Sequence, residues 1–471
     1  MKTKESESKN LSDSFLFREE KIKKRRRNKM RKLLIAMFLF LISFCVFSPV
    51  YAQEIEQVTE EVVVQEVNNI SGADTAFIII CAALVMIMTP GVALFYGGMV
   101  RRKNVLGMLM QSFVVLGIAT VIWLVYGYSL AFGPDIGHVI GSLKWAFLDG
   151  VGLEPEPTYS STLPHQLFMA FQMMFAVLTP ALITGAFAER FKFKAFIIFI
   201  AVWLTIVYCP IAHWVWGQDG WIKNLGGLDF AGGLVVHIAS GTSALAAILV
   251  LGTRNGYKKE AMPPHNLPIT FIGAAILWIG WFGFNAGSAL EASGLAVSAF
   301  VVTHIAAGAA LLSWMIAEWL YRGKPTVLGA VSGAVAGLVA ITPAAGFVTP
   351  ISALIIGFAG GVICFFAVNL KERFGYDDSL DVIGVHGVGG IAGALLTGIF
   401  ATTLVNPGGA DGGVTLLKIQ VISVVATIVY AFIVSFIILK IVDKFVGLRV
   451  EHKEELQGLD LSQHGESGYR F

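Results

Sequence analysis

The sequence predicts an all-α polytopic membrane protein with eleven transmembrane helices, arranged as two inverted five-helix repeats followed by an eleventh helix. Composition gives the first reason, because 56% of the 471 residues are hydrophobic and only 14% are charged. Many of the apolar residues fall in runs of about 20, the length that a helix needs to cross a bilayer. The 51 glycines give a third reason, since small residues let helices pack closely in lipid.

Residues 1–52 have the pattern of a secretory signal peptide. A basic stretch, Lys21 to Lys32, precedes a 15-residue apolar run, Leu33 to Phe47, and small residues suited to cleavage end at Ala52. A retained membrane anchor is the alternative. Removing this leader takes away 13 basic and five acidic residues, so the net charge of +2 becomes −6 and no nucleic-acid partner is expected. Residues 53–72 hold five glutamates and no cation, which is typical of an acidic, solvated extracytoplasmic tail.

Eleven apolar segments make up the expected transmembrane domain, residues 73–442. They cover roughly residues 74–98, 105–132, 163–187, 194–216, 230–252, 267–289, 293–320, 326–342, 349–370, 384–404 and 415–441. Basic residues crowd every second loop, thirteen against three in the alternate loops. By the positive-inside rule the mature N-terminus is expected outside, and the tail of residues 443–471 in the cytoplasm.

A weak internal repeat relates the two halves of the domain. The fifth segment contains Val236-His237-Ile238 and the tenth contains Val385-His386-Gly387, while Phe95-Tyr96-Gly97-Gly98 in the first corresponds to Phe284-Asn285-Ala286-Gly287 in the sixth. Because each repeat has five segments, the two repeats must insert with opposite orientation. Segments five and ten then run antiparallel, and we expect their histidines to meet near the bilayer midplane.

Titratable side chains within apolar segments are costly and usually mark a conduction path, as His237 and His386 are predicted to do. His304 has no counterpart in the other repeat and is expected to be a packing residue. Asp229 and Asp381 precede the two paired histidines; they are expected to cap helices or to attract a cation. No cysteine pattern or clustered ligand set is present, so neither a metal site nor a cofactor is expected.

Spacing also groups several aromatic residues. Phe171 and Phe175 are four residues apart, as are Phe284 and Ser288, so each pair shares a helix face. Trp216 lies at an outer helix end, where tryptophan commonly marks the lipid interface. Spacing alone favours packing or lipid contact for all of them.

Five motifs resemble the Amt/Rh ammonium transport proteins, and specifically the bacterial Amt transporters. They are Ala93–Lys103 (ALFYGGMVRRK), Asp229–His237 (DFAGGLVVH), Trp278–Ser288 (WIGWFGFNAGS), Asp381–Gly390 (DVIGVHGVGG) and Val446–Val450 (VGLRV). The resemblance extends from about Asp74 to the C-terminus. It implies a transporter of ammonium, with methylammonium as a candidate second substrate, and not an enzyme. It also implies a homotrimer with one pore per subunit in the bacterial inner membrane.

The resemblance further implies an outer recruitment site, an aromatic gate and a pore. The matching residues are Trp216, Ser288 and Phe171 for the recruitment site, Phe175 and Phe284 for the gate, His237 and His386 for the pore, and Asp229 for a buried aspartate beside the recruitment site. The ion is expected to lose its proton near the gate, so that neutral ammonia crosses with or without a relayed proton.

The tail of residues 443–471 resembles a regulatory segment at which a trimeric PII signalling protein docks; a merely solvated tail is the alternative. A Rh-like channel for ammonia or carbon dioxide would share the histidines but not Trp216 and Ser288, and saturable current would discriminate against it. An ammonium sensor would need a signalling domain, and an intramembrane metalloenzyme would need clustered ligands such as HExxH, which the sequence lacks.

Overall fold

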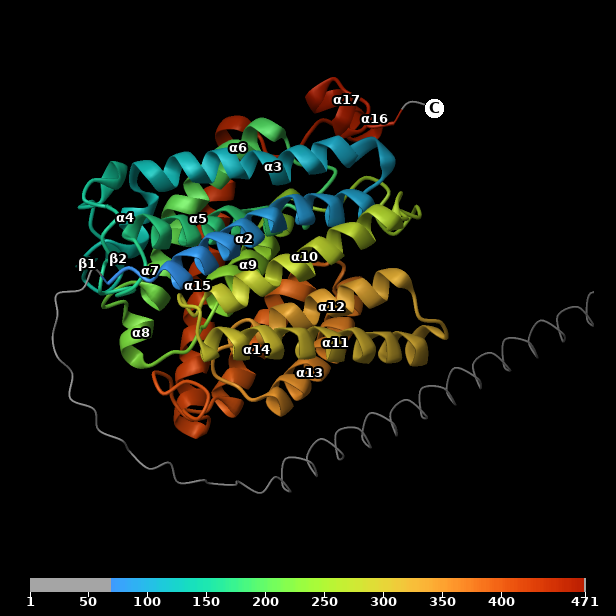
Figure 1. The fold of residues 1–471 in the computed structure, drawn as a ribbon. Helices are drawn as coiled ribbons and strands as arrows, with labels where there is room; N and C mark the ends of the chain where they lie inside the picture. Colours follow the sequence, from blue (N-terminus) through green and yellow to red (C-terminus); the bar gives the residue numbers. More distant parts are fainter. Residues whose placement is uncertain (1–68, 470–471) are drawn as a thin grey trace, which may run out of the picture. The chain divides into compact units, whose positions relative to one another are not determined.

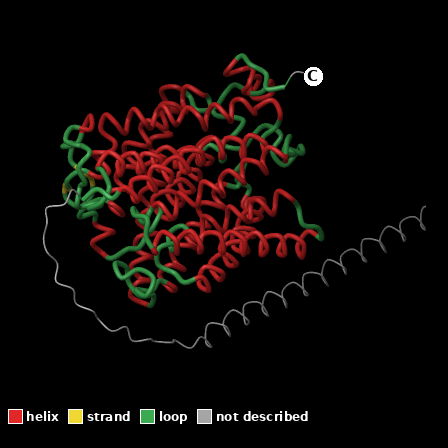
Figure 2. Tube along the Cα trace, in the orientation of Figure 1, coloured by secondary structure: helices red, strands yellow, loops and turns green. Residues whose placement is uncertain are grey.

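The structure, a computed structural model, describes residues 69–469. The expected signal peptide, and the expected acidic tail as far as residue 68, lie outside the described residues. Among the described residues, 69–318 and 325–469 form one compact unit, and residues 319–324, which include the end of helix Gly294–Arg322, are grouped separately. Most of the described chain is helical, with loops between the helices (Figure 2).

The helices follow one another along the chain in the order labelled in Figure 1. Those of the first half are α2 (Gly72–Met99), η1 (Arg102–Asn104), α3 (Val105–Ile122), η2 (Trp123–Gly127), α4 (Tyr128–Phe132), η3 (Ala146–Leu148), α5 (His165–Ile183), α6 (Phe193–Trp203), η4 (Leu204–Tyr208), α7 (Cys209–Trp216), α8 (Trp221–Leu225), η5 (Gly233–Ile238) and α9 (Ala239–Leu251). The remainder are α10 (Leu267–Gly287), α11 (Gly294–Arg322), α12 (Val327–Ile341), α13 (Pro350–Phe374), η6 (Ile383–Gly387), α14 (Val388–Phe400), α15 (Val414–Val446), α16 (His452–Gln457) and α17 (Leu459–His464). One antiparallel hairpin pairs β1 (Asp135–Ile136) with β2 (Ile140–Gly141).

Ten helical segments in the described residues are long and apolar enough to cross a membrane, and the 15-residue α12 is a shorter apolar helix. In chain order these correspond to the eleven predicted segments, which confirms the all-α, multi-pass fold class. Several boundaries follow from capping chemistry: the side chains of Ser71, Thr326 and Thr349 accept backbone hydrogen bonds at the starts of α2, α12 and α13.

Equivalent helices of the two halves pack against each other. The first helix of each half, α2 and α10, lie side by side along much of their length (Figure 1). Gly273 on α10 permits this approach, because a Cβ atom there would collide with the backbone of Phe95. The fifth helices also cross, with α9 against η6 and α14 against η5. At that crossing a Cβ atom on Gly241 would strike the backbone of Gly387.

Loops that the charge pattern assigned to one side of the membrane do lie together. Arg101 pairs with Glu189 at 2.6 Å, and Arg254 pairs with Asp377 at 2.8 Å. These residues follow or precede the first, third, fifth and tenth spans, so the ion pairs tie four loops into one layer. The predicted shared side is therefore confirmed for these loops.

The C-terminal tail folds onto the same layer. Lys103 donates to the carbonyl oxygen of Glu455 at 3.0 Å, and Asp460 accepts from the backbone N–H of Gly107 at 2.8 Å, at the start of α3. The N–H of Leu459 donates to the side chain of Asn104. These bonds fix α16 and α17 to the first loop, which a merely solvated tail would not require.

Candidate functional site

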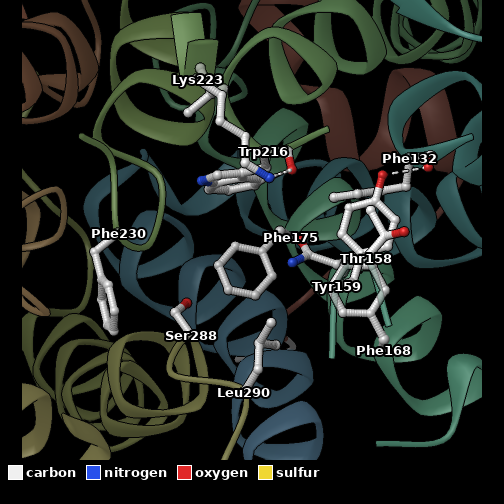
Figure 3. Close-up of a pocket in the computed structure, with 12 residues that line it drawn as sticks. Phe132, Thr158, Tyr159, Phe168, Phe175, Trp216, Lys223, Phe230, Ser288 and Leu290 are labelled. Atoms are coloured by element: carbon white, nitrogen blue, oxygen red, sulfur yellow. Dashed lines mark hydrogen bonds between the residues drawn. The ribbon is translucent and has the colours of Figure 1, made fainter. Parts of the chain in front are cut away.

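A pocket of about 190 Å³ opens on the side of the bundle opposite the tail. Figure 3 shows its lining, which comes from the ends of several spans and their loops. The lining includes Trp216, Ser288, Phe175 and Lys223. Apart from one lysine the lining is aromatic, apolar or neutral polar, which suits a small ligand held by ring faces and a few hydrogen bonds.

Trp216, at the end of α7, is held in the pocket by the loop that starts the next span. Its indole Nε1–H donates to the backbone carbonyl of Asp229 at 2.9 Å, and its ring lies 5.7 Å from that of Phe175 at an interplanar angle of 83°. The indole is therefore fixed in orientation with one face toward the cavity region. A fixed tryptophan face attracts cations through its quadrupole.

Asp229 organises the start of η5 with its carboxylate. Its two oxygens accept four backbone N–H bonds, from Gly232, Gly233, Leu234 and Val235, at 2.6 to 3.3 Å. Burial raises the pKa of Asp229, and the four donors oppose that rise. The carboxylate is occupied by these bonds, so it caps a helix and does not itself line the pocket.

Ser288 presents an acceptor to the pocket. Its hydroxyl donates to the carbonyl of Phe284 at 2.8 Å, one turn earlier in the chain. With its only proton committed, the Ser288 oxygen still has lone pairs for an incoming donor. An N–H donor in the pocket therefore meets an acceptor, and an ion without protons does not gain that bond.

Two phenylalanines close the inner end of the pocket. The rings of Phe175 and Phe284 have centroids 4.4 Å apart, and both side chains are fully or almost fully buried. Phe175 also lines the pocket, whereas Phe284 lies 6.2 Å from the ring of His237 on the other side. The pair thus separates the pocket from the histidines by one layer of aromatic carbon.

His237 and His386 meet behind this layer, as the repeat predicts. Their Nδ1 atoms are 3.2 Å apart, and the rings are nearly parallel with centroids at 5.3 Å. The exposed fractions are 0% and 4%. One Nδ1 must donate and the other accept, so in the neutral pair one outer Nε2 is an acceptor and the other a donor. The Nε2 of His237 has no hydrogen-bond partner among the described residues.

The two histidine-bearing segments run in opposite directions. Each histidine lies on a π-helical turn, η5 or η6, at the start of its span. Asp229 precedes η5 at the pocket end, whereas Asp377, which precedes η6, pairs with Arg254 in the tail-side layer. On that side a cavity of about 10 Å³ lies against His386, Trp281 and Tyr96. The pocket, the phenylalanine pair, the histidines and this cavity form one series through the bundle.

Asp381, predicted to cap the second histidine segment or to attract a cation, does not cap η6. Its backbone has a φ of 64° and its side chain forms an ion pair with Lys371. The cap comes from Asp378, whose carboxylate accepts from the N–H groups of Val382 and Ile383 at 3.1 and 2.7 Å. Burial raises the pKa of Asp378 to about 6. The sequence signal for this residue was the Asp377-Asp378 doublet.

Two further predicted residues do not line the pocket or contact the histidine pair. Phe171 is fully buried and contacts Phe175 at a centroid distance of 5.0 Å, but it does not line the pocket. Phe171 therefore packs against the phenylalanine pair and does not reach the cavity. His304 is exposed on α11 beside Trp278, at 5.4 Å between rings, on the outside of the unit. The paired histidines are therefore distinct in environment from His304.

Trp281 is a site residue that the sequence did not single out. Its ring stacks on His237 at 5.3 Å and 20°, and its Nε1–H donates to Thr342 at 2.8 Å. Helical spacing could have found it, because Trp281 and Phe284 are three residues apart on one face. Within residues 69–469 no group of three or more His, Cys, Asp or Glu side chains is placed to hold a metal ion.

Comparison with known proteins matches the whole transmembrane region. The sequence model of the Ammonium Transporter Family matches residues 76–469. An ammonium transporter of Bacillus subtilis is 55% identical over 402 residues, covering 84% of this chain and 98% of the relative. Ammonium transporter Amt1 of Archaeoglobus fulgidus is 49% identical over 401 residues, covering 85% and 100%. The crystal structure of Saccharomyces cerevisiae Mep2 superposes with a TM-score of 0.77 at 37% identity, covering 81% and 91%.

Proposed function

The chain belongs to the ammonium transporter family, a family of transporters and not of enzymes, and from this premise we propose that it carries ammonium across a bacterial inner membrane. In the proposed mechanism NH₄⁺ binds in the outer pocket, loses a proton at the phenylalanine pair, and crosses as NH₃ along His237 and His386. The observation that supports this most is the pair of imidazoles, 3.2 Å apart and screened from the pocket by aromatic rings.

The outer pocket suits recruitment of a small cation that donates hydrogen bonds. The face of Trp216 offers a cation–π attraction of up to about 2 kcal/mol when desolvated. The Ser288 oxygen can accept one hydrogen bond from the ion, which contributes roughly 1.5 to 3 kcal/mol. Removing such an ion from water costs on the order of 20 kcal/mol in the Born limit and several after relaxation. The pocket can therefore hold the ion but cannot carry it through an apolar pore.

Loss of a proton removes most of the desolvation cost of crossing the pore and makes the route selective for ammonium over potassium. Neutral ammonia passes the Phe175 and Phe284 rings at far lower desolvation cost than the ion. Potassium has a similar size but no proton to lose, so this route excludes it. The histidine pair offers one donor and one acceptor at its outer Nε2 atoms, which provides ammonia with a hydrogen-bonded track. We propose that the released proton is relayed through the pair and makes transport electrogenic: it binds the unprotonated Nε2, the shared proton moves across the Nδ1 contact, and the proton on the other Nε2 leaves toward the far side.

We also propose that the layer containing the tail is cytoplasmic, because thirteen of the sixteen loop cations counted above belong to loops assigned to that side. Family membership supports a homotrimer, and the ordered tail supports docking of a PII-type protein there. Capture of a PII protein by the full chain, and not by a chain ending at Val450, would test the tail. Equal capture by both forms would remove the tail from the proposal.

Ammonium-evoked current in proteoliposomes tests the pore. Replacing His237 and His386 together by leucine should abolish the current, because the track for ammonia and its proton is lost. The matched control is His304→Leu, the same change at an exposed histidine outside the series of cavities, which should leave the current unchanged. Undiminished, potassium-excluding current in the double variant would contradict the mechanism. Non-saturating ammonia flux without current in the unmodified protein would instead favour a neutral gas channel.

A further inference from the structure

The recruitment pocket contains a positive charge where a cation is expected to bind. Lys223, on the short helix α8, is the only charged residue among the twelve described residues that line the pocket. The same lining contains no aspartate or glutamate, and the nearby Asp229 is already occupied by four backbone donors. An incoming ammonium ion therefore meets a lysine and no free carboxylate in the lining.

Contacts around α8 keep this lysine at the pocket. The backbone N–H of Trp221 donates to the carbonyl of His138 at 3.2 Å, and the side chain of Asn224 donates to the carbonyl of Asp219 at 3.0 Å. The Nζ atom of Lys223 lies 3.5 Å from the carbonyl oxygen of Trp216. In the described part of the chain no carboxylate lies within ion-pairing distance of this Nζ atom. Figure 3 shows Lys223 beside Trp216.

The lysine head group has the same chemistry as the cargo. A protonated Lys223 is an alkylammonium ion, which repels NH₄⁺. A sphere of the pocket's volume, about 190 Å³, would be about 7 Å across, which is less than the Debye length of about 10 Å at 0.1 M salt. The repulsion between Lys223 and an ion in the pocket is therefore only partly screened at moderate salt.

We propose that Lys223 weakens capture of the cation, so that it raises the ammonium concentration needed for half-maximal uptake and makes that concentration depend on ionic strength. The inference rests on the proposed function, since it concerns capture of ammonium in the outer pocket. Because the lysine lies outside the gate and the histidine pair, it acts on capture and not on the later steps. Maximal current is thus set elsewhere and does not depend on Lys223.

Lys223→Gln tests the charge, and Lys223→Arg is the matched control that keeps it. Half-saturating ammonium concentration and maximal current would be measured in proteoliposomes at about 10 mM and about 0.5 M ionic strength, where the Debye length falls from roughly 30 Å to below 5 Å. For unit charges roughly 8 Å apart, Coulomb's law predicts that removing the lysine charge changes the half-saturating concentration about twofold at the permittivity of water and about sixfold at half that permittivity. The Gln variant should lower the half-saturating concentration by that factor at low ionic strength, with unchanged maximal current.

The difference in half-saturating concentration between Lys223→Gln and the unmodified protein should disappear at high ionic strength. Lys223→Arg should match the unmodified protein at both ionic strengths. An unchanged half-saturating concentration in Lys223→Gln at low ionic strength would overturn the inference. So would an equal shift in Lys223→Arg, since that would reveal a dependence on shape and not on charge. Either result, obtained with saturable ammonium current in the unmodified protein, would leave the proposed function standing, whereas absence of that current would remove the proposed function itself.

Discussion

Removing the carboxylate of Asp229 should disorder both the outer pocket and the histidine pair. In the structure this carboxylate accepts four backbone N–H bonds at the start of η5. The backbone carbonyl of Asp229 accepts a hydrogen bond from the indole of Trp216. His237 is carried by the same turn. Asp229→Ala leaves the four donors without their acceptor, so the turn that positions both functional groups loses its anchor.

The expected cost follows from these bonds. Loss of a helix cap costs about 1 to 2 kcal/mol, and a buried donor without a partner costs roughly 1 to 3 kcal/mol. Water from the adjacent pocket can satisfy some of the donors, so we expect Asp229→Ala to lower the free energy of unfolding by about 2 to 5 kcal/mol. At roughly 2 °C per kcal/mol this is a fall of about 4 to 10 °C in apparent unfolding temperature. Ammonium-evoked current should fall more than about tenfold, by analogy with misplaced catalytic groups.

Asp229→Asn separates capping from charge, because the amide keeps one oxygen acceptor in the same place. Thermal unfolding in detergent and current in proteoliposomes should both give values between those of the alanine variant and the unmodified protein. An alanine variant with an unchanged unfolding temperature and current would refute the reasoning. An asparagine variant that keeps its stability but loses current as completely as alanine would show that the charge matters and the cap does not.

Three further outcomes are expected. Burial raises the pKa of Asp378 from 3.8 to about 6, so the folded state binds its proton more tightly than the unfolded state does, and the stability that this proton contributes is lost as pH rises from about 4 to 6. The unfolding temperature should therefore be lower at pH 7 than at pH 4.5 by an amount that Asp378→Asn removes. An equal difference in the variant and the unmodified protein would contradict this. Burial lowers the pKa of His464, so protonation of this histidine below about pH 6.5 should weaken the packing of the tail on the bundle. Hydrogen exchange in α17 should therefore become faster as pH falls, and His464→Gln should lack this pH dependence. The same pH dependence in both proteins would contradict the expectation. Gly241→Ala places a methyl group against the backbone of Gly387, which should lower the free energy of unfolding by about 1 to 3 kcal/mol and reduce the ammonium-evoked current. The control Gly117→Ala has open space around the new methyl group and should change neither. A Gly241→Ala variant with unchanged stability and current would show that the two helices can separate at this crossing without loss.

Most of the fold was predictable because lipid imposes a minimum apolar length on each span. Interruptions inside spans were not predictable, since apolar composition continues through them. The π-helical turns at Trp123–Gly127 and Leu204–Tyr208 are examples. The short eighth span was predictable: the segment expected at residues 326–342 is observed as α12, Val327–Ile341.

In the site, the meeting of the two histidines was predictable from the repeat, because inverted insertion brings equivalent positions together. Local geometry was not. Asp381 has a positive φ and turns away to Lys371, so the cap falls to Asp378, a choice that depends on the shape of the loop. Phe171 shares a helix face with Phe175, but close packing against Gly287 keeps it out of the pocket.

The histidine contact joins residues 149 positions apart in the chain, and this separation has a consequence for biosynthesis. Helices enter the bilayer as they leave the ribosome, so the half that carries His237 is inserted well before η6 is made. Until η6 is made, His386 is absent and the contact between the two imidazoles cannot form. The tenth span brings His386 to His237, and the eleventh, α15, then packs against both α9 and α14.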